Sequence, residues 1–154
     1  MIHNISALVS KDEFGRTIEG VMLYPDRVVA TNSFTLIERM MPTGVTDPIS
    51  VLLPKGIKTF DEVTITGEDV TLTNMKTLAQ YRSRKIDGSL PEYKQIIPSD
   101  DPVLTIKLNP KLLIELCKAF KDHADGVEFK FWGDKKPVQL NAGDLMGLIM
   151  PILK

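Results

Sequence analysis

The sequence predicts an α+β fold built from antiparallel sheets, with helices packed on one face of them. Two observations lead to this prediction. Short stretches of alternating apolar and polar residues are separated by Gly, Pro, Asn and Asp, which is typical of strands joined by hairpins. One stretch, residues 109–122, has instead the three- and four-residue apolar spacing of an amphipathic helix.

The first half of the chain carries the clearest hairpin signals. Residues 20–24 (GVMLY) and 27–31 (RVVAT) are apolar and β-prone on either side of a Pro-Asp turn. Residues 62–66 and 70–73 alternate around a second turn that contains Gly67. Further strands are expected over residues 34–40, 49–54 and 77–86, with a short helical turn over 55–60 and an ordered loop over 87–98.

The second half contains the predicted helix. Asn109 is a good N-cap, and Pro110 suits the first helical position. The helix is expected to run to Asp122 with one apolar face, formed by Leu112, Leu113, Leu116, Cys117 and Phe120. Strands are expected over residues 103–108, 127–132, 137–140 and 145–153. The order strand, helix, strands thus occurs weakly from Ile49 and clearly from Val103, which indicates an internal repeat of architecture.

Composition limits the classes of function. The chain has 154 residues, 43% of them hydrophobic, and a net charge of −1. This is enough chain for one compact domain, but there is no basic excess, so any DNA contact must come from a local patch. The single cysteine, Cys117, excludes an intrachain disulfide; it is expected to be a buried small hydrophobe in a reducing compartment.

Targeting signals are not expected. The first residues carry acids early and have no long apolar run, unlike a signal peptide. No apolar run approaches the ~20 residues that span a bilayer. A cytoplasmic protein without a membrane partner is therefore expected.

Catalysis has little support in the sequence. The two histidines, His3 and His123, are far apart in sequence, and no Cys/His cluster has metal-ligand spacing. No glycine-rich phosphate loop is present. We therefore expect no enzyme, no cofactor and no metal. A small hydrolase stays an alternative, because catalytic triads are recognised by geometry rather than by sequence order.

Three stretches resemble segments of one family. Residues 19–23 (EGVML) with 29–36 (VATNSFTL) resemble "NGVLL…VATDGHRLA" of the bacterial DNA polymerase III beta-subunit, or DNA sliding clamp, family. Residues 87–93 (DGSLPEY) with the following IIP resemble "DGRFPDYRRVLP", and 148–154 (LIMPILK) resembles the ending "VVMPMRL". The resemblance implies a shortened chain with a DNA-clamp-like fold of repeated strand-helix-strands units.

The resemblance also implies a domain organisation. Residues 1–98 resemble the middle domain of the clamp, and 99–154 resemble the carboxy-terminal half of its last domain, with one compact domain expected overall. The clamp's amino-terminal domain has no counterpart. Asn32, Ser33 and Phe34 replace the usual Asp, Gly and His, and Gln95 replaces a common arginine.

In this family, one groove per chain binds short peptides from DNA polymerases and other replication proteins. Apolar walls suit a peptide with leucine and phenylalanine anchors. The residues at matching positions are Ile18, Thr31, Ser33, Leu36, Pro91, Gln95, Ile96, Ile149, Met150, Pro151 and Ile152. An ordinary β-rich interior would also contain such residues, so a purely structural role is the alternative.

Clamps also present helix lysines to duplex DNA without reading its bases. The resemblance implies this role for the following residues: Lys55, Lys58, Lys111, Lys118 and Lys121. A solvated helix face explains the same lysines equally well.

Two functions from different classes follow. The first is a replication accessory factor that assembles into a homo-oligomeric ring, encircles DNA and tethers a polymerase. The second is an adaptor or competitor that binds clamp-binding peptides without encircling DNA.

Overall fold

The computed structural model describes residues 20–32, 34–54, 57, 59–87, 92–123 and 125–153. Ile18, Ser33, Lys55, Lys58 and Pro91, for which a binding role was expected, lie outside these residues. The chain divides into two compact units, Met1–Ile96 and Ile97–Lys154, and each is described by itself.

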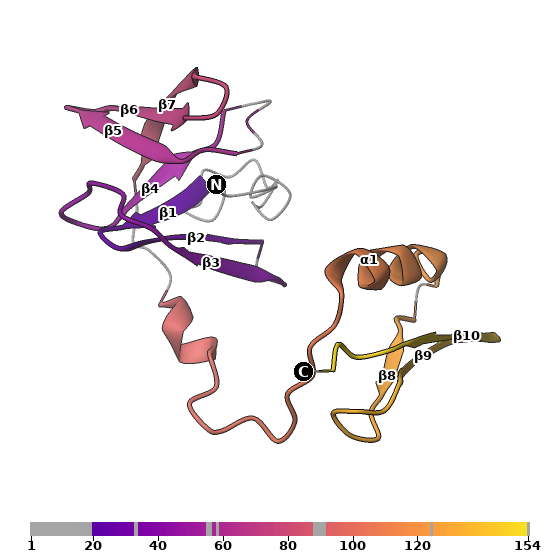
Figure 1. The fold of residues 1–154 in the computed structure, drawn as a ribbon. Coiled ribbons are helices and arrows are strands. Elements are labelled where there is room, and N and C mark those ends of the chain that lie inside the picture. The colour runs from indigo at the N-terminus through magenta and orange to yellow at the C-terminus, as the bar shows by residue number, and fades with distance from the viewer. Residues whose placement is uncertain are drawn as a thin grey trace. The chain divides into compact units, whose positions relative to one another are not determined.

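The first unit contains one antiparallel sheet with the strand order β3-β2-β1-β4-β7-β6-β5 (Figure 1). Each expected strand of this half is present, with ends that differ from the expected ones by two residues or fewer. The strands are β1 (Gly20–Tyr24), β2 (Arg27–Thr31), β3 (Leu36–Met40), β4 (Ile49–Leu52), β5 (Glu62–Thr66), β6 (Asp69–Asn74) and β7 (Ala79–Ile86).

The main core lies on one face of this sheet. Alternation places Val21 and Leu23 of β1 on that face with Val28 and Ala30 of β2. Phe60, from the segment after β4, is fully buried in the same cluster. The opposite face of β5, β6 and β7 is mostly polar, so this part of the sheet is half-buried, as the alternating sequence predicts.

The segment after β4 differs from its prediction. The described residues of 55–60, namely Ile57, Thr59 and Phe60, are not helical. Ile57 donates its backbone N–H to the Pro54 carbonyl oxygen at 3.3 Å, and its side chain is buried beside Phe60. Burial of two large side chains at a spacing of three residues produced an apolar pattern that resembled one helical turn.

A smaller cluster covers the other face of the sheet. Met22 and Val29 pack there against Tyr93 of a short 3-10 helix, η3 (Tyr93–Ile96), with Tyr24 and Leu36 at the margin. The loop expected over residues 87–98 therefore includes a turn of helix that is anchored to β1, β2 and β3.

The second unit contains the helix α1 (Pro110–Ala119) and a sheet with the order β10-β9-β8 (Figure 1). The strands are β8 (Glu128–Lys130), β9 (Val138–Ala142) and β10 (Leu145–Ile149). The Asn109 side chain accepts a hydrogen bond from Lys111 N at 3.0 Å, which confirms the expected N-cap. The helix ends three residues before Asp122, because the backbone of Phe120 leaves the helical conformation and its ring is buried.

The helix packs on the sheet through a narrow stripe. Leu113, Leu116 and Phe120 contact a core that includes Val138 and Leu140. Gly147 of β10 makes room for them, since a Cβ atom there would lie 2.7 Å from Leu116 Cδ1. A sheet of three strands covers only this stripe of the helix.

Two residues that were expected on the buried face of this helix, Leu112 and Cys117, are exposed instead. The expectation of a buried Cys117 was therefore wrong. Both residues lie at the margins of the stripe, and the sheet does not extend far enough to cover them.

The strand expected over residues 103–108 is also absent, because no ladder forms there. One backbone hydrogen bond, from Ile152 N to Lys107 O at 2.7 Å, joins this segment to the carboxy-terminal tail. Ile106 and Leu108 pack against the core, which accounts for the alternating pattern. The predicted class of fold is confirmed, with one α-helix in the described residues where about two were expected.

Candidate partner-binding surfaces

Thr31 and Leu36 form one candidate pair in the first unit. They lie directly opposite each other on β2 and β3, next to the connection between these strands. The Thr31 hydroxyl donates to the Thr35 carbonyl oxygen at 2.8 Å. The Asn32 side-chain oxygen accepts from Thr35 N at 2.8 Å, a role that a carboxylate could also fill. Asn32 therefore stabilises the connection between β2 and β3.

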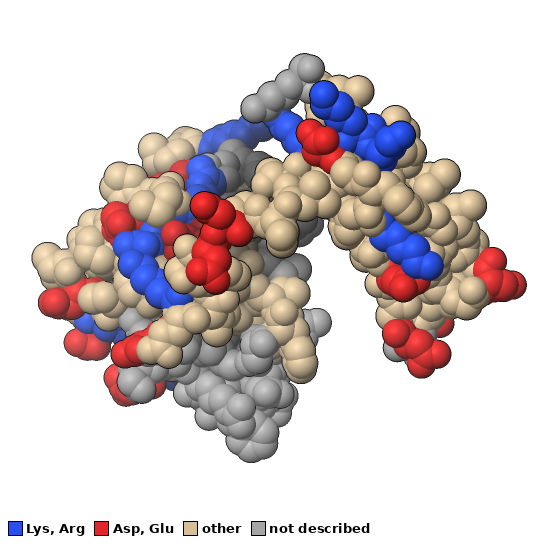
Figure 2. All heavy atoms as spheres, turned by 90° about the horizontal axis from the view of Figure 1, so that it is seen from below, with Lys and Arg blue, Asp and Glu red and all other residues tan. Residues whose placement is uncertain are grey.

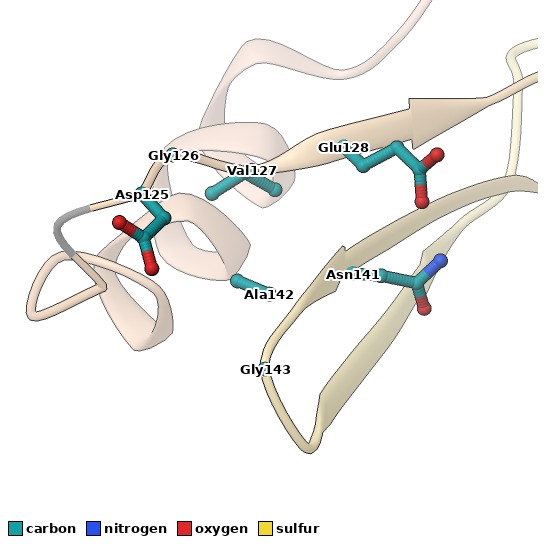
Figure 3. Close-up of a pocket in the computed structure, with 7 residues that line it drawn as sticks. All are labelled: Asp125, Gly126, Val127, Glu128, Asn141, Ala142 and Gly143. Atoms are coloured by element: carbon teal, nitrogen blue, oxygen red, sulfur yellow. The ribbon is translucent and has the colours of Figure 1, made fainter.

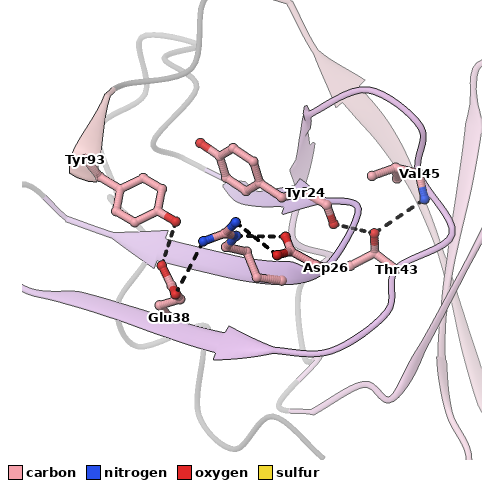
Figure 4. A network of polar contacts seen from close by, with 7 residues as sticks. Tyr24, Asp26, Glu38, Thr43, Val45 and Tyr93 are labelled. Carbon is pink, nitrogen blue, oxygen red and sulfur yellow. Dashed lines mark hydrogen bonds and ion pairs between the residues drawn. The ribbon is translucent and has the colours of Figure 1, made fainter. Parts of the chain in front are cut away.

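Tyr93 anchors η3 in the small cluster against which Leu36 also packs. Its hydroxyl donates to Glu38 Oε2 at 2.6 Å, and its ring lies edge-on to Tyr24 with centroids 5.8 Å apart (Figure 4). Burial raises the pKa of Tyr93 to about 12, and the hydrogen bond to the Glu38 carboxylate contributes to the shift. Tyr93 is therefore a neutral donor near pH 7, and η3 is held to β3 by a charge-assisted hydrogen bond.

Arg27 completes the polar network in Figure 4. Its guanidinium donates to both oxygens of Asp26, at 2.8 and 3.0 Å, and lies 3.7 Å from Glu38 Oε1. The Thr43 hydroxyl donates to the Tyr24 carbonyl oxygen at 2.6 Å. These contacts tie η3, β2 and β3 together and so position this surface.

Gln95 and Ile96 follow Tyr93 in η3. The Gln95 side chain donates to the Glu92 carboxylate within the same turn. The Ile96 side chain is 71% exposed, although it adjoins a rigidly anchored turn. Among the described candidates of the first unit, Ile96 is thus the apolar side chain most available to a partner.

The carboxy-terminal tail carries the candidates of the second unit. Ile149 belongs to the core, and Pro151 is also buried. Met150 and Ile152 alternate with them and are 58% and 44% exposed. The structure therefore divides the four expected binding residues into two that stabilise the unit and two that are accessible to a partner.

A hollow of about 610 Å³ lies beside this tail. Its lining joins three segments that are distant in sequence: Thr105 and Lys107, Asp134 and Lys135, and Ile152 and Leu153. Of these residues, Ile152 was expected from the sequence to bind a partner, and Lys107 and Lys135 were not. Lys107 occupied a polar position of a predicted strand, and Lys135 followed a predicted turn, so neither carried a signal of its own.

The helix lysines lie away from the core of their unit. Lys111 and Lys118 are exposed on the side of α1 opposite Leu113 and Leu116, and Lys121 is exposed just beyond the helix end. Glu115 lies between the first two on the helix surface. On the face shown in Figure 2, Lys and Arg side chains are intermingled with Asp and Glu. These lysines offer local positive charge without a continuous basic surface.

A second hollow in this unit, of about 480 Å³, lies between the turn that precedes β8 and the turn between β9 and β10. In Figure 3 the Asp125 carboxylate lies at one end, and the Glu128 carboxylate and the Asn141 amide lie at the other. Glu128 also forms an ion pair with Lys130 at 3.0 Å. The two carboxylates therefore lie at opposite ends of the hollow, and Glu128 is paired with Lys130.

The described part of the chain also bears on metal binding and on membrane insertion. No group of three or more His, Cys, Asp or Glu side chains is arranged to hold a metal ion among these residues. None of the helices found there is long and apolar enough to cross a membrane.

Comparison with solved structures identifies the class of fold as that of the bacterial DNA polymerase sliding clamps. The sliding clamp of Bacillus subtilis is similar over 97% of this chain, with a TM-score of 0.67 and 18% identity. The DNA polymerase III beta chain of Streptococcus pneumoniae is similar over 97% of this chain, with a TM-score of 0.68 and 14% identity. This confirms the similarity of fold that the sequence motifs implied.

The chain spans 46% of each of these two solved structures, less than half their length. The beta subunit of Streptococcus pyogenes is also similar in fold to this chain, with a TM-score of 0.66 and 13% identity. No family model matches the sequence, and the comparison with curated proteins gives no match. With identities of 18%, 14% and 13%, these comparisons establish similarity of fold alone.

Proposed function

We propose that this protein is a clamp-like DNA replication accessory factor rather than an enzyme. It binds peptides of polymerases or other replication proteins through apolar side chains, and it encircles double-stranded DNA as a homo-oligomer. The observation that carries the proposal is a sliding-clamp fold over 97% of the chain in which the clamp-like tail leaves Met150 and Ile152 exposed. In this proposal, residues 1–98 correspond to the clamp's middle domain and 99–154 to the second half of its last domain.

The proposed peptide contacts use accessible apolar side chains, which each unit offers separately. Ile96, Met150 and Ile152 are exposed, yet each adjoins a segment that is anchored to its own unit. Burying two leucine-like or phenylalanine-like anchors contributes roughly 3–6 kcal/mol before entropic costs. Binding should therefore be weak and exchangeable, which suits a platform that is shared by several partners.

Aspartate at Met150 or at Ile96 is expected to weaken peptide binding at least about tenfold, because each places a charge against an apolar anchor. The measurement is fluorescence anisotropy of a short labelled peptide with leucine and phenylalanine anchors. Circular dichroism verifies that each variant is folded.

Matched controls are available for both variants. Met146→Asp changes a side chain of β10 that is 56% exposed, close to the 58% of Met150. Met75→Asp changes a 55% exposed side chain of the first unit. Unchanged affinity in folded Met150→Asp or Ile96→Asp, or an equal loss in the matched control, would refute the proposed contact in the unit concerned.

The proposed DNA contact uses lysines that touch phosphates and read no bases. Replacing Lys111, Lys118 and Lys121 by alanine is expected to reduce the slope of log affinity against log salt by up to about 2.7, or about 0.9 for each phosphate contact. The measurement is a salt titration with a labelled duplex. A triple alanine variant at Lys76, Lys94 and Lys136 removes the same charge elsewhere, and an equal effect there would contradict the assignment.

The alternative function, an adaptor or competitor that never encircles DNA, differs in its oligomeric state. A ring needs several copies of a chain of this length, whereas an adaptor can function as a monomer or a small oligomer. A monomeric mass in solution at micromolar concentration, together with intact peptide binding, would favour the adaptor.

A further inference from the structure

The strand β8 forms one edge of the sheet in the second unit. It pairs with β9 on one side, and among the described residues no strand lies on its other side. The side chains of all three of its residues are exposed. The outer side of an edge strand carries backbone N–H and C=O groups that are free to pair with another strand. The backbone of β8 can therefore accept a strand from a second chain.

Two aromatic rings lie along this edge. Phe129 is directly opposite Leu140 of β9, so its ring lies on the same face of the sheet as the core beneath α1. Phe131 follows two residues later, and the two rings stack with their centroids 6.4 Å apart and their planes 16° from parallel. Phe129 is 42% exposed and Phe131 is 48% exposed. The apolar face of the unit therefore reaches the edge strand and is covered only in part there.

The other face of β8 carries two opposite charges. Glu128 lies opposite Asn141 of β9 (Figure 3), and Lys130 lies opposite Gln139. The two charged side chains form an ion pair at 3.0 Å with each other, and they are 65% and 43% exposed. An ion pair this exposed contributes little to stability, so either charge can take a new partner at little cost. The order acid, phenylalanine, base is self-complementary about Phe129.

A second copy of β8 fits this edge in one register. When two copies pair antiparallel about a two-fold axis at Phe129, Glu128 of each copy lies opposite Lys130 of the other. An axis at Glu128 or at Lys130 would place like charges opposite each other, which destabilises a strand pair. A shift of the register by one residue would set Phe129 against a charged side chain. Both the charges and the rings therefore favour the axis at Phe129.

We propose that β8 is the contact of a two-fold symmetric dimer, in which it pairs antiparallel with β8 of a second copy of this chain. The two three-stranded sheets become one continuous sheet. On its apolar face Phe129 packs against Phe129 of the second copy, and Phe131 packs against Val127. The inference rests on the homo-oligomer proposed above and names one of its contacts. A two-fold contact alone stops at two copies, so a larger ring needs a second contact elsewhere.

Reversed charges test this contact in sedimentation velocity experiments on the full chain. Glu128→Lys and Lys130→Glu each place two pairs of like charges across the axis. Each variant alone is therefore expected to dimerise about tenfold more weakly than the wild type at low salt. An equimolar mixture of the two variants should recover the wild-type affinity, because the introduced charges face each other and so do the native ones. The double variant with both changes should recover it as well.

Matched controls make the same reversals outside β8. Lys136→Glu and Asp144→Lys change exposed side chains of the same unit and should leave dimerisation unchanged. Losses in both single variants without recovery in the mixture would contradict the pairing of β8 with itself. Unchanged assembly in both single variants would overturn the inference and leave the proposed homo-oligomer standing on another surface. A wild-type chain that is monomeric at roughly 100 μM would overturn the inference and the homo-oligomer together, and the peptide titration would still test the adaptor.

Discussion

Alanine at Gly20 is expected to lower the free energy of unfolding of the first unit by about 3 kcal/mol or more. A Cβ atom at this position would lie 2.2 Å from the Val51 carbonyl oxygen and 2.8 Å from Ile86 Cδ1. The oxygen belongs to the backbone of β4, so β1 and β4 would have to separate where Gly20 pairs with Leu52. Hydrogen exchange of the amides of β1 and β4 measures this cost in the unit concerned.

Gly67→Ala is the control for this prediction. A Cβ atom at Gly67 would have no neighbouring atom within 4 Å, but the φ of this residue, 62°, is in the left-handed region. Alanine there should cost about 1 kcal/mol through backbone strain alone. If Gly20→Ala costs no more than Gly67→Ala, the close approach of β1 and β4 is contradicted.

Alanine at Phe60 is expected to destabilise the first unit by about 3–5 kcal/mol. The ring is fully buried in the main core, where it packs with residues from several strands. Truncation removes apolar contacts and leaves a cavity that the sheet cannot close without distortion. Urea unfolding followed by far-ultraviolet circular dichroism measures the loss.

Phe34→Ala makes the same chemical change at a side chain that is 94% exposed. It should alter the stability by less than about 0.5 kcal/mol. Phe60→Leu, which keeps most of the volume, should cost less than Phe60→Ala. A similar small effect for Phe60→Ala and Phe34→Ala would show that the segment after β4 does not close the core.

Strands and turns were predicted well where the pattern was local. The pairing of β1 with β2 depends on apolar, β-prone residues on either side of Pro25-Asp26, and β5 pairs with β6 around Gly67. The start of α1 depends on Asn109 and Pro110, whose effects act within a single turn. In each case the residues that determine the structure are adjacent in sequence.

The predictions of secondary structure and burial were wrong where the structure depends on contacts between residues that are distant in sequence. Ile57 and Phe60 have helix-like spacing, but burial against the sheet determines their conformation. Ile106 and Leu108 alternate as a strand would, yet one hydrogen bond to the tail replaces a ladder. Cys117 lies at a position that the helical pattern makes apolar. It is nevertheless exposed, because the neighbouring sheet is too narrow to cover it. No local pattern contains this information.

The exposure of the candidate binding residues could be predicted only in part, for the same reason. The resemblance at the chain end identified Met150 and Ile152, which are exposed, together with Ile149 and Pro151, which are buried. The hollow beside the tail joins segments around residues 105–107, 134–135 and 152–153. Its lysines could not be identified from the sequence, because their proximity to the tail exists only in the folded unit.

The exposure of Cys117 has a practical consequence. It is the one thiol of the chain, and it lies on α1 outside the stripe formed by Leu113, Leu116 and Phe120. A maleimide dye should therefore attach at a single known position and leave the interior intact. Donor and acceptor dyes on separate copies would then report assembly directly by energy transfer, without any engineered residue.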